Sequence, residues 1–138
     1  MLAAYDGPDL PTRPSDVNDT SLVLLLTNGG TRALFTGDLN APLGRYLALN
    51  EPRVHADVLK VPHHGTDGLA PNEFFDRVGA KVALVPSPRY LWLGERSRRA
   101  REYFAARKVE VYVNGIHGDV MVRIGPRGFV VTSSRPIR

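Results

Sequence analysis

Two loops carry side chains that could bind metal ions. Asp38 lies in loop 36–38 after one apolar segment, and His63 and His64 lie in loop 62–65 after another. Imidazole and carboxylate groups are standard ligands for zinc and similar metals. A carboxylate can bridge two divalent ions while imidazoles complete their coordination, an arrangement that activates hydroxide for attack on phosphorus or a carbonyl carbon. We therefore expect Asp38 and one of the two histidines to project toward a common point.

Both loops also have a plain structural interpretation, in which the aspartate caps a helix or forms a turn and the histidines are surface residues. Catalytic zinc normally takes about three protein ligands, so Asp38, His63 and His64 do not complete a two-ion site by themselves. The other histidines do not obviously supply the remaining ligands. We expect His55 at the surface and His117 in a turn, with a supporting hydrogen bond to a ligand or a substrate contact as the alternative for His117.

The segments around these loops predict a layered α/β arrangement. A hairpin is expected from two β-rich runs joined by Asn-Gly-Gly at 28–30. The later segments alternate between strand and helix patterns, which gives the order ββ-α-β-α-β-α-βββ. In layered α/β proteins, ligands bind at the loops that follow the strands. The expected strands are 21–27, 31–36, 54–61, 81–86, 109–113, 120–124 and 129–132, and the expected helices are 40–49, one beginning at 71, and the basic, amphipathic 95–108.

The composition fits one folded domain. With 138 residues, 43% of them hydrophobic, the chain is long enough for a single core, and without cysteine any metal must be held by His, Asp or Glu. The net charge of +4 favours an anionic partner without specifying it. The longest apolar run, residues 22–26, is too short to cross a bilayer, so we expect no membrane segment. We expect residues 1–17, rich in proline, to be a flexible arm and residues 18–135 to be the folded unit.

Three segments resemble a known family in their order and spacing. Residues 18–24 (NDTSLVL), 34–38 (LFTGD) and 56–66 (ADVLKVPHHGT) are similar to the metallo-β-lactamase-like domain of ComEC-type DNA-uptake competence proteins and their free-standing hydrolase relatives. The helix and strand pattern extends this resemblance to about Arg135. The resemblance implies the C-terminal half of a metallo-β-lactamase-like αββα sandwich.

The resemblance also implies a site and a reaction. Asp38 matches the aspartate that bridges the metals in this family, and His63 or His64 matches its last metal-ligand histidine, with His63 slightly favoured. Two ions, usually zinc, would activate water, with Asp38 and His63 as the catalytic residues. The implied function is metal-dependent hydrolysis of a phosphodiester or related ester, with DNA taken up by the cell as the suspected substrate.

The sequence departs from the family pattern in two places. The His-x-His-x-Asp-His motif of the N-terminal half does not occur, nor does the further histidine between that motif and the aspartate. The loop that often carries Gly-His-Pro reads PSPRYLWLG at 86–94. We therefore expect an incomplete zinc site in this chain, completed by the missing N-terminal half of the domain or supported by homodimerisation. A ComEC-type protein would place the domain at the outer face of the cytoplasmic membrane, and a free-standing one in the cytoplasm.

A non-catalytic nucleic-acid-binding or structural module with a degenerate metal site is the alternative function. Its basic helix 95–108 would contact phosphates, although a solvated arginine-rich face is the more common role of such a helix. Arg89, Tyr90 and Trp92 could stack on bases, whereas an aromatic pair beside a strand more often packs in the core.

Overall fold

The first two strands form the hairpin that the sequence predicts. β1 (Leu24–Asn28) pairs antiparallel with β2 (Thr31–Phe35), and Gly29 and Gly30 form the turn with φ of 55° and 86°. Positive φ at both central positions of a two-residue turn suits the twist of the strands, and glycine adopts it at no steric cost.

The structure, a computed structural model, describes residues 17–136. The expected arm over residues 1–17 therefore lies outside the described residues, except for Val17.

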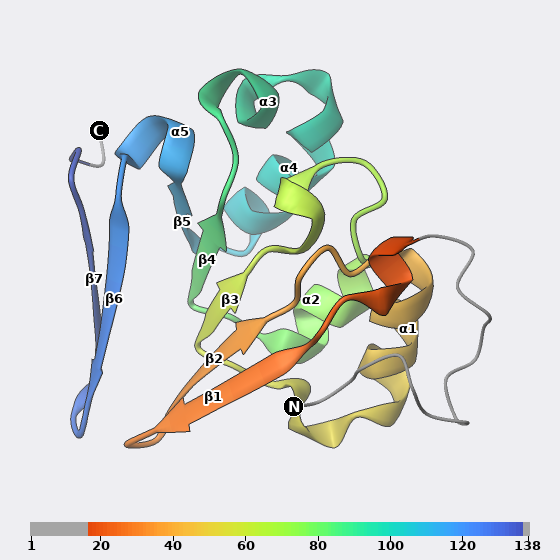
Figure 1. The fold of residues 1–138 in the computed structure, drawn as a ribbon, viewed down its shortest axis with the longest axis horizontal. Helices are drawn as coiled ribbons and strands as arrows, with labels where there is room; N and C mark the ends of the chain where they lie inside the picture. Colours follow the sequence, from red (N-terminus) through yellow and green to blue (C-terminus); the bar gives the residue numbers. More distant parts are fainter. Residues whose placement is uncertain (1–16, 137–138) are drawn as a thin grey trace.

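Parallel strands build the rest of the main sheet, which has the order β1-β2-β3-β4-β5 (Figure 1). β3 (Val58–Lys60) pairs with β2, β4 (Val82–Val85) with β3, and β5 (Glu110–Val113) with β4, all in parallel. The crossovers contain α1 (Ala41–Asn50), α2 (Asn72–Val78) and α4 (Arg98–Ala106). The molecule is therefore mixed α/β, and the loops that follow β2 to β5 emerge at one edge of the sheet.

Short helices fill the connections. They are the 3-10 helices η1 (Val17–Thr20), η2 (Pro52–Val54), η3 (Pro62–Gly65) and η4 (Glu95–Ser97), and the α-helical turns α3 (Arg89–Leu93) and α5 (Asn114–His117). The strand expected at 54–61 is shorter, because Val54 belongs to η2, residues 55–57 have no strand structure, and η3 follows at Pro62. The helix expected at 95–108 begins with η4. α3 lies in a segment expected to be a loop. It is too short for a periodic pattern, and its buried Trp92 packs against Gly65.

One face of the sheet packs against the helices and forms the main core. Leu34, Leu59 and Ala83 lie side by side on this face, and Phe74 and Phe104 cover them from α2 and α4. The apolar stripes predicted for these helices are buried as expected. Within residues 17–136, no helix combines the length and apolar character that crossing a bilayer requires.

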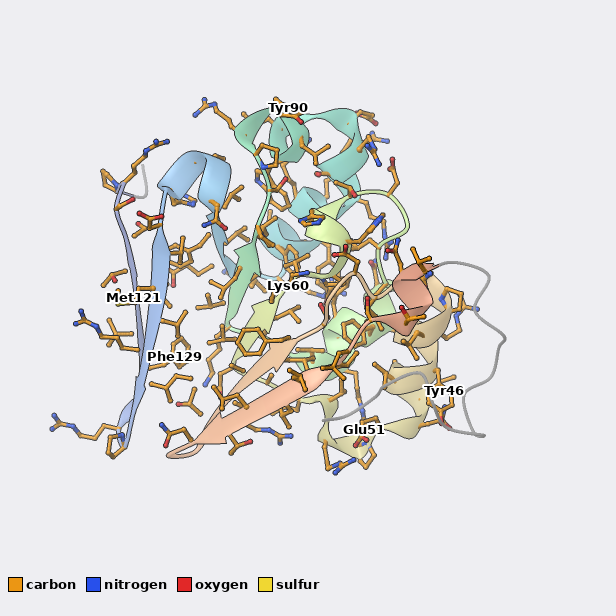
Figure 2. All side chains as sticks on the ribbon, in the orientation of Figure 1. Tyr46, Glu51, Lys60, Tyr90, Met121 and Phe129 are labelled. Carbon is orange, nitrogen blue, oxygen red and sulfur yellow. The ribbon has the colours of Figure 1, made fainter. Side chains whose placement is uncertain are left out.

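The opposite face is partly covered by a separate hairpin. β6 (Val120–Gly125) and β7 (Gly128–Ser133) pair only with each other, although the sequence pattern grouped them with β5 as closing strands. Figure 2 shows their side chains, Phe129 among them, filling the space between this hairpin and the main sheet. Near β1 the face stays uncovered, because Leu24, Leu26 and Phe35 are 40%, 49% and 43% exposed.

Candidate metal centre

Asp38 is held by the loop that follows β2. Its backbone N–H donates to Oγ of Ser21 at 2.9 Å, and Gly37 precedes it with φ of 55°. A Cβ at position 37 would lie 2.9 Å from Cβ of Ser21, so no larger residue fits there without a shift. Thr36 donates from Oγ1 to the carbonyl oxygen of Lys60 at 2.8 Å and ties this loop to β3. These contacts fix the direction in which the carboxylate leaves the sheet.

The two histidines follow β3 in an unusual backbone conformation. His63, His64 and Gly65 all have positive φ, at 49°, 54° and 74°. The left-handed region costs a residue with a Cβ about 1–2 kcal/mol, although histidine tolerates it better than most. Trp92 lies against Gly65, where a Cβ would come within 2.9 Å of the indole ring. Strain of this kind is typical of functional sites, where the surrounding structure enforces it.

His64 lies beside Asp38. Its Nε2 is 3.6 Å from Oδ1 of Asp38, and its Nδ1 is 2.7 Å from the carbonyl oxygen of Pro86. Because a carbonyl oxygen can only accept, Nδ1 carries the proton, and Nε2 of the neutral ring presents a lone pair. The separation is close to the ~3.4 Å expected between two ligands of one tetrahedral zinc ion, each ~2.0–2.1 Å from the metal. The donors and their spacing therefore fit a metal.

His63 is directed elsewhere. Its Nδ1 contacts the carbonyl oxygen of Asp67, and its Nε2 lies 3.5 Å from Nδ2 of Asn18. In the described part of the chain, no ion pair joins His63 to Asp38. The structure thus brings His64, rather than the slightly favoured His63, to the aspartate. Within residues 17–136, no three His, Asp or Glu side chains cluster closely enough to hold a metal ion, and Asp38 and His64 are a pair of such side chains.

Lys60 places a positive charge at this edge. Its Nζ lies 3.5 Å from Oδ1 of Asp38 and also donates to the carbonyl oxygen of Gly37. The side chain is only 21% exposed, and this burial lowers the pKa of Lys60, while the carboxylate of Asp38 opposes the shift. Lys60 is not among the candidate residues that the sequence motifs indicate. A lysine inside the apolar run 58–61, two residues before the histidine loop, was the available signal.

Comparison with known proteins gives two relatives. Over 80 residues, 57% of this chain, it is 39% identical to ComE operon protein 3 of Bacillus subtilis (strain 168). Over 119 residues, 86% of this chain, it is 28% identical to the uncharacterized protein YcaI of Escherichia coli (strain K12). The matched regions span 10% and 16% of the length of these relatives. No protein-family profile matches the chain. The first similarity supports the expected relationship to a competence-operon protein.

The other two histidines lie apart from Asp38. His55 is exposed, as expected, next to Gly79. His117 ends α5 and is 7% exposed, so it is a buried residue of a short helix and not a residue of the expected turn. Its Nδ1 accepts a hydrogen bond from the backbone N–H of Val113 at 2.8 Å, and its ring packs edge-on to Tyr112. Neither histidine forms an ion pair with Asp38 in the described residues.

Proposed function

We propose that Asp38 and His64 are ligands in the metal centre of a metallo-β-lactamase-like hydrolase, and that this chain forms the C-terminal half of such a domain. The observation that carries the proposal is the Nε2 lone pair of His64, fixed by Pro86 and 3.6 Å from the carboxylate of Asp38. Imidazole nitrogen and carboxylate oxygen are ligands that zinc accepts in catalytic sites. Zinc is therefore the proposed metal, with two ions in the completed site.

The reaction we propose is hydrolysis of a phosphodiester or a related ester, with DNA in uptake as the substrate. The family resemblance of the segments around Asp38 and His64 supports it, and so does the similarity to ComE operon protein 3. A bound metal would supply an activated hydroxide. Asp38 and His64 would hold the metal, and the carbonyl oxygen of Pro86 keeps the neutral imidazole of His64 in the tautomer with a free lone pair on Nε2. Lys60 places a positive charge beside the carboxylate, where it attracts an anionic ester.

The uncovered part of the sheet supports completion by another layer. Leu24 and Leu26 of β1 and Phe35 of β2 point to the face that the β6–β7 hairpin covers elsewhere. Adjacent exposed apolar side chains on a sheet commonly mark an interaction surface. We propose that either the N-terminal half of the domain or a second copy of this chain covers this face.

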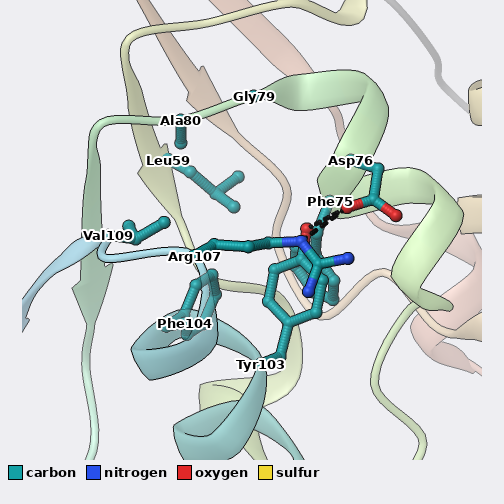
Figure 3. Close-up of a pocket in the computed structure, with 9 residues that line it drawn as sticks. All are labelled: Leu59, Phe75, Asp76, Gly79, Ala80, Tyr103, Phe104, Arg107 and Val109. Carbon is teal, nitrogen blue, oxygen red and sulfur yellow. Dashed lines mark hydrogen bonds and ion pairs between the residues drawn. The ribbon is translucent and has the colours of Figure 1, made fainter.

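The alternative, a nucleic-acid-binding module that uses the basic helix, has less support. The arginines of this segment already have partners within the protein. Arg107 pairs with Asp76 at 2.7 Å and stacks on Tyr103 beside a small cavity (Figure 3). Arg96 and Arg98 pair with carboxylates, and Arg99 and Arg101 donate to backbone carbonyl oxygens. Because these arginine side chains already bind carboxylates or carbonyl oxygens, they would have to leave these partners to contact the phosphates of a nucleic acid.

A zinc titration of the ¹⁵N-labelled chain, followed through the imidazole nitrogens, tests the proposal. We expect zinc to shift Nε2 of His64 and to leave the nitrogens of His55 unchanged. Asp38→Asn should weaken zinc binding about tenfold or more, since it removes an anionic ligand. His55→Asn is the matched control and should bind zinc like the wild type.

Equal binding by wild type and Asp38→Asn would contradict the metal centre. Hydrolysis is measured separately, with bis(p-nitrophenyl) phosphate as the substrate. Zinc-dependent turnover that Asp38→Asn abolishes would support the hydrolase. Zinc bound at His64 without turnover, in a sample where the uncovered face is occupied, would favour the degenerate module instead.

A further inference from the structure

A cleft opens beyond the end of β5, at the sheet edge from which the loops of Asp38 and His64 also emerge. It is lined by Arg89, Ile116, His117, Arg135 and Pro136 and has a volume of about 520 Å³. Arg89 is the first residue of α3, His117 the last of α5, and Arg135 follows β7. The chain segments that meet here come from three different parts of the sequence. The side chains of Arg89 and Arg135 form no ion pair among the described residues, and of the polar atoms of His117 only Nδ1 is engaged by the core, through Val113.

The walls of the cleft are fixed by close backbone approaches. Gly115 donates its N–H to the carbonyl oxygen of Ser87 at 2.9 Å, which brings α5 against the start of α3. A Cβ at position 115 would lie 2.1 Å from the backbone nitrogen of Arg89, so only glycine permits this approach. On the other wall, the N–H of Arg135 donates to the carbonyl oxygen of His117 at 3.0 Å. The backbones that carry the two arginines are thus anchored around His117.

His117 offers one hydrogen-bond donor to this cleft. The backbone N–H of Val113 donates to Nδ1, so Nδ1 holds the lone pair and Nε2 of the neutral ring carries the proton. Within residues 17–136, Nε2 has no hydrogen-bond partner, although the side chain is only 7% exposed. A donor held in one tautomer at the wall of a cleft suits an acceptor ligand.

The arginines of the cleft differ from those of the basic helix. No ion pair engages Arg89 or Arg135 among the described residues, whereas Arg96, Arg98 and Arg107 are all paired. Two free guanidinium groups and one N–H donor, with no carboxylate in the lining, make a site for a phosphate group. Guanidinium groups bind phosphate oxygens in a bidentate manner, which favours phosphate over a single-point anion.

The cleft lies close to the metal centre along the chain. Pro86, which orients His64, precedes Arg89 by three residues, so their Cα atoms are at most about 11 Å apart. One strand of a nucleic acid carries a phosphate every ~3.4 Å of helix axis. A few nucleotides therefore span the distance between Pro86, which contacts His64, and Arg89 in the cleft.

We propose that Arg89, His117 and Arg135 bind a non-reacting phosphate of the nucleic acid strand whose phosphodiester lies at Asp38 and His64. The choice of a nucleic acid strand as the ligand rests on the proposed function. The phosphate specificity of the cleft rests on its own residues.

The test measures binding of a fluorescein-labelled single-stranded oligodeoxynucleotide to the whole chain in EDTA, so that metal plays no part. Arg89→Ala and Arg135→Ala should each weaken binding roughly 3- to 10-fold and lower the salt dependence of log K by about 0.7 for each phosphate that the variant no longer neutralises. His117→Asn keeps an acceptor for Val113 but removes the Nε2 donor, and it should also weaken binding. Arg127→Ala, at the exposed β6–β7 turn, makes the same change in net charge and should bind like the wild type.

Inorganic phosphate provides a second readout, because it should shift the Nε2 signal of His117 and compete with the oligonucleotide. An equal loss of binding in Arg127→Ala, or wild-type binding by both cleft variants, would overturn the proposal. The zinc titration at His64 is independent of this result. A cleft that binds phosphate in a chain that fails to bind zinc would reject the metal centre and leave the cleft standing.

Discussion

Oδ1 of Asp38 and Nε2 of His64 lie 3.6 Å apart, although they follow different strands. The contact exists because β2 and β3 are parallel neighbours, so the loops after them emerge at the same edge of the sheet. The imidazole is oriented by a third strand, since Pro86 follows β4. Three successive strands thus define the geometry of two side chains.

The backbone of His64 gives the first prediction. Because φ is 54°, His64→Gly should be more stable than His64→Ala by about 1 kcal/mol, although both lose the hydrogen bond to Pro86. Urea unfolding of the two variants measures the difference. At His55, where φ is −57°, the order should reverse, with alanine the more stable residue. An alanine variant at 64 as stable as the glycine variant would show that the left-handed conformation carries no strain.

The environment of Lys60 gives a second prediction. Its ammonium group lies beside the carboxylate of Asp38, so a metal ion bound to that carboxylate would be repelled by a neighbouring positive charge. Lys60→Met keeps the length and apolar packing of the side chain, and we expect it to bind zinc about 3- to 10-fold more tightly at neutral pH. Isothermal titration calorimetry gives the affinity. Lys108→Met, at an exposed position, controls for net charge, and an equal gain there would attribute the effect to long-range electrostatics.

The positions of Asp38 and the histidine pair after strands could be predicted from the sequence, but which imidazole lies beside Asp38 could not. The turn glycines and strand patterns placed Asp38 and the histidine pair after strands, which is enough to put them at one edge. Which imidazole meets Asp38 depends on three successive left-handed residues. That conformation is set by Trp92 and Pro86, which lie far along the chain, and no local pattern encodes it.

The remaining differences also come from tertiary packing. β6 and β7 have ordinary strand patterns, and only their packing over Val58 and Val82 shows that they form a separate sheet. His117 follows β5 between two glycines, a setting typical of a turn. Its burial results from the close approach that Gly115 permits against Arg89. Such packing joins segments whose sequences give no sign of each other.

Asp57 gives a prediction about acid stability. Its carboxylate accepts from Nζ of Lys81 at 2.8 Å and from the N–H of Arg32 at 3.0 Å, linking β3 to both neighbouring strands. The Lys81 ammonium, helped by that N–H, lowers the pKa of Asp57 below its ordinary value of 3.8. A lowered folded-state pKa means that the ionised form adds stability above pH 3.8, which is lost as pH falls through the folded value.

Asp57→Asn should therefore be less stable than the wild type at pH 7, by about 1 kcal/mol. The two proteins should converge as the pH is lowered below 3.8. Urea unfolding at a series of pH values measures the difference. A difference in the free energy of unfolding that stays constant across the acid range would show that the charge of Asp57 does not contribute to stability.

The uncovered face of the sheet gives the last prediction. Leu26 pairs with Ala33 on the face opposite the helices and is 49% exposed, beside Leu24 and Phe35. If a second copy covers this face, the chain sediments as a dimer at micromolar concentration, and Leu26→Lys shifts it to a monomer because a buried unpaired charge is costly. Leu49→Lys, on the exposed side of α1 at 77% exposure, makes the same substitution away from the face and should leave the dimer intact. A wild-type monomer would reject the second copy and leave the N-terminal half of the domain as the proposed cover, whereas equal dissociation by both variants would place the interface elsewhere.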